Sequence, residues 1–323
     1  MLDGYSFVIP AYNDAEGLKQ HFSYFAEVHD RVQLVVVDDC STDDTQEVVE
    51  AVHLPENIRL TYHRIEQNAG PGPARNLGLS LAEEERVMFL DADDLLAPCF
   101  FDVMRLAPLS GEVDFVMFKY HLSRETGLRF TYDMHLVDRR FFSSVPAHNF
   151  PVQQFRLQDI PEVLATVNFP WNKVYRRDFL LEREVSFPDL RMHEDITPHW
   201  QSFLECRAFG IMGWAPPLIT HFEVPAAGRA TNYIGEKRMG VFAELSAIEG
   251  KILSHSQASR LLPVFSNFCG SFFDWLTEGL CREGGDESLF WKERYQNAVE
   301  EFWDASCVAA PVIDHDGGGV PLK

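Results

Sequence analysis

The sequence predicts an α/β fold, in which a mainly parallel sheet is flanked by helices and followed by a helical C-terminal extension. In the first hundred residues, short apolar and β-branched runs alternate with longer amphipathic stretches. Strands that alternate with helices of this length favour parallel pairing through right-handed crossovers. After about Tyr233 the strand-like runs stop, and only long helical patterns remain.

The predicted strands are short apolar runs that end at proline or at acidic residues. The first covers residues 7–9 and ends at Pro10. The second, residues 33–37, is strongly β-branched, which suits the pleated surface of a sheet. Further strands are expected at residues 58–62, 86–90, 113–118 and 129–132.

Helices are expected where apolar residues recur every three or four positions. Residues 14–28 place Leu18, Phe22 and Phe25 on one face. Polar residues 41–45 can cap a helix that runs to about Val52. The other helices are expected at residues 73–81, 161–167, 195–209, 236–253, 259–280 and 287–302.

Composition and charge exclude several kinds of partner. The chain has 323 residues, a formal net charge of -21 and a pI of about 4.9, so it should repel nucleic acid and anionic lipid. No run approaches the length of a membrane span, and the first residues lack the pattern of a signal peptide. Six scattered cysteines without a CxxC pair favour free thiols in a reducing compartment. We therefore expect a cytoplasmic protein without a transmembrane segment, and peripheral membrane contact is left open.

The most informative motif is the run from Phe89 to Asp94, in which Asp91, Asp93 and Asp94 follow a buried strand. Carboxylates at the end of a buried strand are costly unless something compensates their charge. A divalent cation is a suitable compensator, because hard cations take oxygen ligands. This edge of an open α/β sheet is also where ligands bind. The alternative is an Asp-rich surface turn.

Two other predicted strands end in groups that can contact a ligand. Residues 10–13 follow the first strand, and Asp38 and Asp39 follow the second. If these strands are parallel neighbours of the strand before Asp91, all three groups meet at one edge. Asp38 or Asp39 can then accept a hydrogen bond from an imide N–H such as that of uracil. Each acid taken alone is more often a cap or a turn residue.

A Gly- and Pro-rich segment, residues 68–76, leads into the helix at 73–81. It lacks both the GxGxxG fingerprint and the GxxxxGK[ST] pattern, so it is neither a dinucleotide fingerprint nor a P-loop. Its glycines permit close approach of a ligand, and Arg75 can donate to a phosphate or an acid. The alternative is a rigid helix-entry loop in which Arg75 pairs with Asp38 or Asp39.

Together these segments resemble the inverting glycosyltransferases of family 2, which have the GT-A fold. The resemblance covers roughly residues 5–100, and its pieces are residues 8–13, 36–45, 68–78 and 89–94. A weaker match follows in residues 170–180, which resemble the family's W-x-K-x-Y-R-x-x-x-L segment, and in Glu194-Asp195, which resembles its E-D motif.

The resemblance implies a nucleotide site and a metal. Asp39 would contact the nucleotide base, in a pocket lined by Pro10 and Tyr12. Arg75 would lie near the base or the diphosphate. Asp91 would contact the ribose, and Asp93 would hold Mg²⁺ or Mn²⁺ on the diphosphate of a nucleotide-diphospho-sugar, with UDP as the first candidate.

The resemblance also implies the chemistry. Asp195 would deprotonate the acceptor hydroxyl, with Glu194 beside it, while Trp171 and Lys173 would shape the donor-sugar or acceptor side. One base without a nucleophile implies single displacement, hence inversion. The acceptor would be a carbohydrate or a glycolipid, in polysaccharide or glycoconjugate synthesis. The alternative for the Glu194-Asp195 pair is a helix N-terminal acid pair favoured by the dipole.

The change to purely helical patterns divides the chain at residue 232. Residues 1–100 would form the nucleotide-binding half and 101–232 the acceptor half of the catalytic domain, while 233–323 form the helical extension. The extension is rich in aromatic residues, which could support acceptor binding or a homo-oligomer. Where the family shows Tyr-Arg and Ser-x-Ser, this chain has other residues, so His221 or Arg229 could complete the metal or diphosphate site.

Three rival functions remain open at this point. A nucleotidyltransferase would carry a Gly-rich loop with an arginine after the first strand, but residues 11–16 of this chain contain neither glycine nor arginine. A catalytically inactive glycosyltransferase-like protein would bind a nucleotide sugar or a partner without turnover. In a carbohydrate-binding module, Trp171, Trp200 and Trp214 could stack on sugars, although aromatic residues at helical spacing are more often core.

Overall fold

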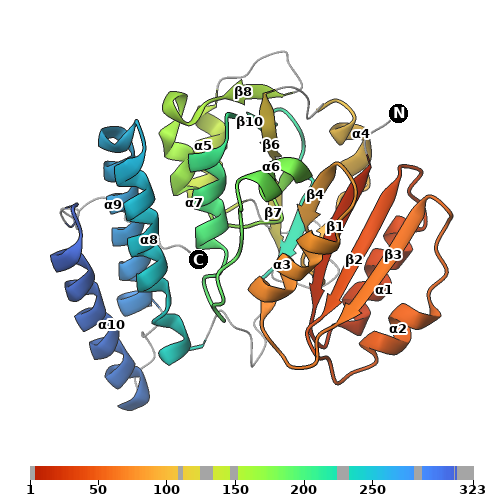
Figure 1. The fold of residues 1–323 in the computed structure, drawn as a ribbon, viewed down its shortest axis with the longest axis horizontal. Coiled ribbons are helices and arrows are strands. Elements are labelled where there is room, and N and C mark those ends of the chain that lie inside the picture. Colours follow the sequence, from red (N-terminus) through yellow and green to blue (C-terminus); the bar gives the residue numbers. More distant parts are fainter. Residues whose placement is uncertain are drawn as a thin grey trace.

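The architecture follows from a computed structural model, which describes residues 4–107, 112–123, 134–145, 152–223, 233–279, 286–308 and 310. One eight-stranded sheet occupies the middle of the molecule, and the C-terminal helices stand together at one end of it (Figure 1). The expected strand at 129–132 lies outside the described residues.

The N-terminal part of the sheet is parallel, as predicted. Its strands are β1 (Tyr5–Ala11), β2 (Val32–Asp38), β3 (Ile58–Arg64) and β4 (Arg86–Phe89), in the spatial order β3-β2-β1-β4. All residues of β2 and β4 are buried, which explains their nearly continuous apolar sequence. The parallel pairing brings the carboxyl ends of β1, β2 and β4 to the same edge.

The second half of the sheet is mixed. Strand β9 (Lys173–Arg176) runs antiparallel between β4 and β6 (Val113–Met117), and β10 (Ala208–Ile211) and the edge strand β8 (Gln153–Phe155) complete the sheet. A small second sheet contains β5 (Leu95–Leu96), β11 (Ile219–Phe222) and β7 (Tyr120–Ser123). The pairing of β5 with β11 places residues near Asp94 beside residues near His221.

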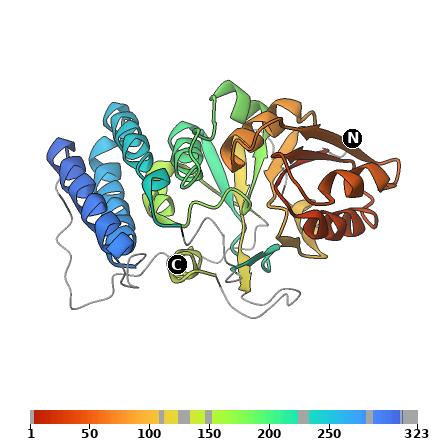
Figure 2. The same ribbon diagram turned by 90° about the horizontal axis from the view of Figure 1, so that it is seen from below.

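Helices cover both faces of the parallel strands (Figure 2). Phe7 of β1 packs on Phe25 of α1 (Ala15–Phe25), at 4.8 Å between ring centroids, whereas the next residue, Val8, faces α3 (Pro71–Leu81) on the opposite side. Successive side chains of β1 thus point to opposite faces of the sheet and pack against a helix on each face. The remaining helices before residue 206 are α2 (Thr45–Ala51), α4 (Phe100–Met104), α5 (Leu136–Ser144), α6 (Arg177–Glu182) and α7 (Ile196–Glu205), with 3₁₀ turns at Leu157–Asp159 and Pro161–Ala165.

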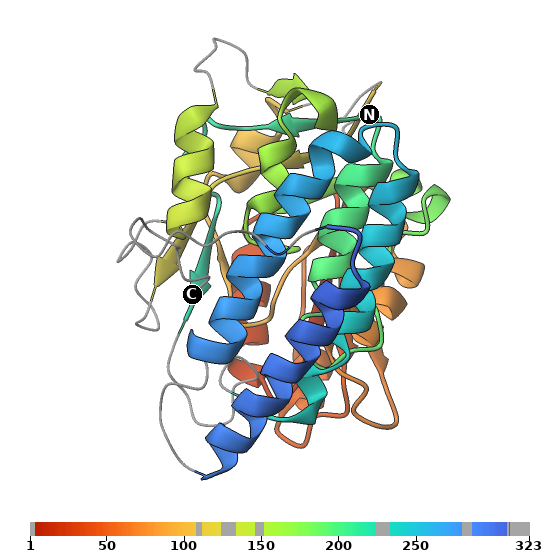
Figure 3. The ribbon, with the colours of Figure 1, turned by 90° about the vertical axis from the view of Figure 1, so that its left-hand side faces the viewer.

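The C-terminal helices α8 (Val241–Ser254), α9 (Ala258–Asp274) and α10 (Asp286–Ala305) lie side by side (Figure 3). A 3₁₀ turn at Glu236–Arg238 precedes them, and a π-helical segment at Trp275–Gly279 extends α9. Trp200 of α7 packs against Phe265 and Phe268 of α9, so these helices share the core of the sheet domain. No helix in the described residues is long and apolar enough to cross a membrane.

Most predicted elements are confirmed, and two need correction. The helix expected at 195–209 ends at Glu205, and Ala208 and Phe209 belong to β10. The segment expected as a helix at 161–167 is a short 3₁₀ turn ending at Ala165. The predicted division at residue 232 falls among residues outside the described part, so that boundary remains a prediction.

A glycine sets the distance between α3 and the sheet. A Cβ at Gly78 would lie 2.3 Å from Val8 Cγ1, so Gly78→Ala should lower the free energy of unfolding by about 1–3 kcal/mol. Gly250 of α8 has nothing within 4 Å of the equivalent position. We expect Gly250→Ala to stabilise the protein by about 0.5–1 kcal/mol through helix propensity. Urea denaturation of both variants tests this; equal effects would contradict the assigned packing.

Candidate active site

The site is built at the carboxyl ends of β1, β2 and β4, where the predicted polar segments do meet. Ala11 pairs with Asp38 in the register of β1 and β2, and Asp39 N donates to Ala11 O at 2.8 Å. Asp91 follows β4 by two residues. The prediction that three strand ends share one edge of the sheet is therefore confirmed.

Asp39 holds the Gly-rich loop in place. Its two carboxylate oxygens accept from Ala69 N at 2.6 Å and Gly70 N at 2.7 Å. Gly70 has a φ of 96°, which a residue with a Cβ rarely adopts. Burial raises the pKa of Asp39, while the two amide bonds oppose this rise. Because each carboxylate oxygen has two lone pairs, the contact with the loop leaves acceptor capacity for a ligand.

The neighbouring acid, Asp38, has a structural environment. It accepts from Arg64 at 2.5 Å, Tyr62 at 2.8 Å and Ser41 N at 2.7 Å. The alternative in which Arg75 pairs with Asp38 or Asp39 is wrong, because the Arg75 guanidinium donates to Asp91 and Glu194 instead. Burial opposes the effect of these three donors, which together lower the pKa of Asp38.

Pro10 and Tyr12 flank the same strand end. Pro10 is half-buried in β1, whereas the Tyr12 side chain is 53% exposed. The next residue, Asn13, has a φ of 53°, and its side-chain oxygen accepts from Thr42 N at 2.6 Å. An exposed ring beside a fixed turn has room to stack on a planar ligand.

The Asp91–Asp94 segment forms a turn after β4. Asp94 N donates to Asp91 O at 3.2 Å, and the His21 ring lies 3.1 Å from the same carbonyl oxygen. Burial lowers the pKa of His21 to about 4, so the ring is neutral and donates through Nε2–H. Asp91 and Asp93 are half-buried, while Asp94 is fully buried.

Asp94 is paired with His221 of β11, at 2.8 Å between Oδ1 and Nδ1. Although burial alone would lower it, the charges of Asp94, Asp93 and Asp91 raise the pKa of His221 to about 9. The His221 ring stacks on Trp171 at 4.9 Å between centroids. His221 therefore supplies positive charge to this acidic turn, while Arg229 lies outside the described residues.

The acidic turn fits a divalent cation that shares its ligands with a substrate. Asp94 Oδ2 is buried and has no hydrogen-bond partner, and three carboxylates raise the negative potential locally. No group of three His, Cys, Asp or Glu side chains among the described residues forms a ready cage. Mg²⁺ and similar ions often take one or two carboxylates and complete their shell with phosphate oxygens and water. The donor set suits that mode of binding.

Arg75 joins the acidic turn to the E-D segment. Its guanidinium donates to Asp91 Oδ1 at 2.7 Å and to Glu194 Oε1 at 2.8 Å, and the side chain is 6% exposed. It also lies over the ring of Phe187, 5.3 Å from the centroid. The resemblance implied that Arg75 lies near the base or the diphosphate of the nucleotide. The structure places it between the two acidic motifs.

Asp195 lies at the N-cap of α7 and is half-buried. Burial first, and then the negative charges of Glu194 and Asp91, raise the pKa of Asp195 to about 7, while Arg75 opposes the rise. Its side chain makes no capping hydrogen bond to the helix, and its place at the N-cap also suits the alternative of a helix N-terminal acid pair favoured by the dipole. A carboxylate with a pKa near neutrality is suited to accept a proton from a substrate.

The segment before Asp195 is clamped to the Gly-rich loop. Asn76 and Phe187 exchange two hydrogen bonds, at 2.7 and 2.9 Å. Arg191 donates to the side chain and the carbonyl oxygen of Asn68. A Cβ at Gly72 would come within 2.7 Å of Pro188 O, so this glycine permits the close approach.

Trp171 and Lys173 lie in the core, with 1% and 0% exposure. Lys173 Nζ donates to Phe169 O at 2.7 Å and Asn172 Oδ1 at 2.8 Å. Burial lowers the pKa of Lys173 to about 7. Trp171 supports His221 by stacking. Any influence of these two residues on a substrate passes through their neighbours, and their predicted role at the donor or acceptor side remains a prediction.

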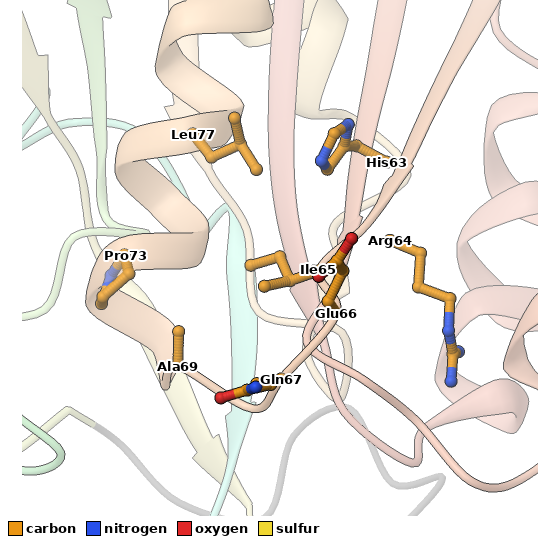
Figure 4. A pocket seen from close by; sticks show the side chains of 8 residues that line it. All are labelled: His63, Arg64, Ile65, Glu66, Gln67, Ala69, Pro73 and Leu77. Carbon is orange, nitrogen blue, oxygen red and sulfur yellow. The ribbon is translucent and has the colours of Figure 1, made fainter.

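A shallow groove of about 600 Å³ lies beside this site, between the end of β3 and the start of α3 (Figure 4). Ala69, whose amide binds Asp39, borders the groove. None of the predicted site residues lines it; the lining residues are His63, Arg64, Ile65, Glu66, Gln67, Ala69, Pro73 and Leu77.

Sequence reasoning missed two polar residues, His21 and Arg238, which contacts His193, and it missed the pairing of Asp94 with His221. Asp94 belongs to the predicted acidic motif, but its partner His221 lies 127 residues further along the chain, so the sequence gives no sign of the pairing. No local pattern marks Arg238, because its significance depends on long-range packing.

Comparison with known sequences gives a family match. The family model "Glycosyl transferase family 2" matches residues 6–183 of this chain. The chain is similar to "Glycosyltransferase GlyG" of Streptococcus pneumoniae, with 25% identity over 156 residues, or 48% of each chain. It is also similar to "Poly(ribitol-phosphate) beta-N-acetylglucosaminyltransferase TarS" of Staphylococcus aureus, with 35% identity over 96 residues, or 28% of this chain and 16% of that protein. The matches thus span half or less of these relatives.

Solved structures extend the similarity to nearly the whole chain. S. aureus TarS 1-349 in complex with UDP-GlcNAc matches with a TM-score of 0.71 and 21% identity, covering 95% of this chain and 82% of that one. The mannosyltransferase PcManGT of Pyrobaculum calidifontis, in complex with GDP-Man and Mn²⁺, matches with a TM-score of 0.50 and 17% identity, covering 94% and 88%. At these identities the similarity is one of fold.

Proposed function

The chain belongs to glycosyl transferase family 2 and has the GT-A fold, and from this premise we propose that it transfers a sugar, with inversion, from a nucleotide-diphosphate donor to an acceptor hydroxyl. The observation that carries the proposal is the half-buried Asp195, whose pKa is raised to about 7 and which Arg75 and Glu194 link to the acidic turn at Asp91.

In this proposal the donor occupies the strand-end edge. Asp39 and Tyr12 would receive the base and Asp91 the ribose, and Asp93 would hold Mg²⁺ or Mn²⁺ at the diphosphate. The bound cation would act as a Lewis acid that offsets the charge developing on the leaving diphosphate. The buried Asp94–His221 pair fixes the turn that contains Asp93.

The acceptor side completes a single displacement. The acceptor oxygen forms a bond to the anomeric carbon as the bond to the diphosphate oxygen breaks, and the hydroxyl proton passes to the Asp195 carboxylate. Arg75 holds Glu194 and Asp91 in fixed positions around that base. An α-linked donor would yield a β-linked product.

The relatives suggest the class of substrate. TarS binds UDP-GlcNAc and is described as a poly(ribitol-phosphate) N-acetylglucosaminyltransferase, and PcManGT binds GDP-Man and Mn²⁺. We propose a UDP-sugar as the donor and a saccharide chain or glycolipid as the acceptor, in polysaccharide or glycoconjugate synthesis.

A thermal-shift screen tests the donor site. UDP with Mn²⁺ should raise the stability of the parent protein by about 2.7 kcal/mol at a hundredfold excess over Kd, because the ligand binds only the folded state. Asp93→Ala should lose the metal-dependent part of this shift. Asp178→Ala, which removes a carboxylate that is 73% exposed, is the matched control and should keep it.

The same screen separates the proposal from its rivals. A shift that needs no metal and survives in Asp93→Ala would remove the metal site from the proposal. A metal-dependent shift without any turnover of the sugar nucleotide, to water or to an acceptor, would favour the catalytically inactive binding protein.

A further inference from the structure

Arg238, in the 3₁₀ turn before α8, is the most deeply buried of the arginines that the structure describes after residue 233. Its side chain has 0% exposure. Nε donates to Tyr233 O at 2.6 Å, Nη1 lies 2.8 Å from His193 Nε2, and the guanidinium lies over the Trp275 ring at 5.0 Å. A buried charge that is held by specific contacts is costly to displace, so these contacts hold the Arg238 side chain in one position.

His193 is the residue that Arg238 contacts, and it immediately precedes Glu194 and Asp195. Its ring packs edge-on against Phe272 and Trp275, at 4.9 and 5.8 Å between centroids. Burial, together with the positive charge of Arg238, lowers the pKa of His193 to about 3. The ring is therefore neutral, and its Nε2 accepts the hydrogen bond from Arg238.

The backbone of His193 carries this anchoring to Asp195. Its φ of 64° lies in the left-handed region, which a residue with a Cβ adopts only at a cost in conformational energy. His193 O accepts from Ile196 N at 3.3 Å and so closes the turn that contains Glu194 and Asp195. Strain of this kind persists only where surrounding contacts hold it, and here those contacts come from the C-terminal helices.

The base-bearing turn is thus held from two sides. The Gly-rich loop clamps residues 187–191 through Asn76 and Asn68. The C-terminal part holds His193 through Arg238, Phe272 and Trp275. Trp275 is the first residue of the π-helical segment, and π-helical turns are frequent at functional sites.

We propose that Arg238 is a positioning residue that sets, through His193, the direction in which Asp195 faces the acceptor, so that the 3₁₀ turn before α8 and the C-terminal end of α9 help to position the base. This inference rests on the proposed role of Asp195 as the base. It gives the helical extension a task distinct from oligomerisation or membrane contact.

The test compares Arg238→Gln with Arg238→Lys in the full chain. We expect Arg238→Gln to lower kcat about tenfold to a hundredfold with little change in the KM for the donor, because a small displacement of a reacting group costs this much in rate. Arg238→Lys keeps a cationic donor without the planar fork and should recover part of the loss. Glu249→Gln is the control: Glu249 is buried, accepts from Ser306 and Cys307, and belongs to α8 without contacting His193.

Amide hydrogen exchange provides a readout independent of turnover. Arg238→Gln should speed exchange in residues 193–196, while Glu249→Gln leaves them unchanged. Unchanged kcat together with unchanged exchange in Arg238→Gln would overturn the inference, as would an equal loss in Glu249→Gln. If the parent protein bound no nucleotide diphosphate, the proposed function would fail, and with it the assignment of Asp195 on which the inference rests. Amide exchange in residues 193–196 would then show only whether Arg238 holds the turn that begins at His193.

Discussion

Replacing Asp195 with Asn should lower kcat by about 10²–10⁴-fold, which is the usual contribution of a general base. Asn has the same shape but cannot accept the proton of the acceptor hydroxyl. Binding of UDP with Mn²⁺ should persist, because the donor is expected at Asp39, Asp91 and Asp93. Initial rates with a UDP-sugar and an acceptor, together with a nucleotide titration, measure both quantities.

The pH profile tests the same assignment. Because burial and the neighbouring acids raise the pKa of Asp195 to about 7, the unprotonated base is lost as the pH falls below that value. The rate of the parent protein should therefore decline about tenfold per pH unit below about pH 7. The residual rate of Asp195→Asn should not show this decline below about pH 7.

As the pH rises from about 4 to about 7, the rate should rise, whereas the contribution of Asp195 to folding stability should fall. A carboxyl whose pKa is higher in the folded than in the unfolded state costs stability as the pH rises from about 4 to about 7, because the folded state binds the proton more tightly. Asp195→Asn removes that cost, so its Tm should exceed that of the parent at pH 8 and approach it at pH 4. Asp189→Asn, an exposed acid in the same segment, should alter neither rate nor stability. A strong effect there, or a fully active Asp195→Asn, would remove Asp195 from the role of base.

The parts of the site that the sequence predicted are those in which local pattern determines position. Strands β1, β2 and β4 are apolar runs followed by polar residues, and parallel pairing brings their ends together. The Gly-rich loop was expected to approach a ligand closely. In the structure its amides at Ala69 and Gly70 bind Asp39 directly.

The parts that the sequence could not predict depend on partners far away in the chain. Strand β9 runs antiparallel between two parallel strands, and nothing in its four residues specifies that direction. The helix expected through Phe209 stops at Glu205, because Ala208–Ile211 pairs with β6 and β8. An apolar run of four residues suits either a buried helix or a buried strand, so tertiary pairing decides.

Arg75→Gln should have the largest effect on stability, lowering the free energy of unfolding by about 3–5 kcal/mol. The guanidinium is almost fully buried between Asp91 and Glu194, at 2.7 and 2.8 Å. Removing it leaves two carboxylates close together without their cation. Arg59→Gln is the control, because Arg59 and Glu83 form an exposed pair, 47% and 64% exposed, worth only about 0–1 kcal/mol.

The pH dependence of this deficit distinguishes its cause. If uncompensated charge destabilises Arg75→Gln, the deficit should shrink towards pH 4, where carboxylates accept protons; a deficit that is equal at pH 4 and pH 8 would indicate lost packing on Phe187 instead. Arg75 also lowers the pKa of Asp195, so its removal should move the acid limb of the rate profile to higher pH. Arg75 would then set both the stability of the turn at Asp91 and the proton affinity of Asp195. It does so because its single positive charge compensates Asp91 in one acidic motif and Glu194 in the other.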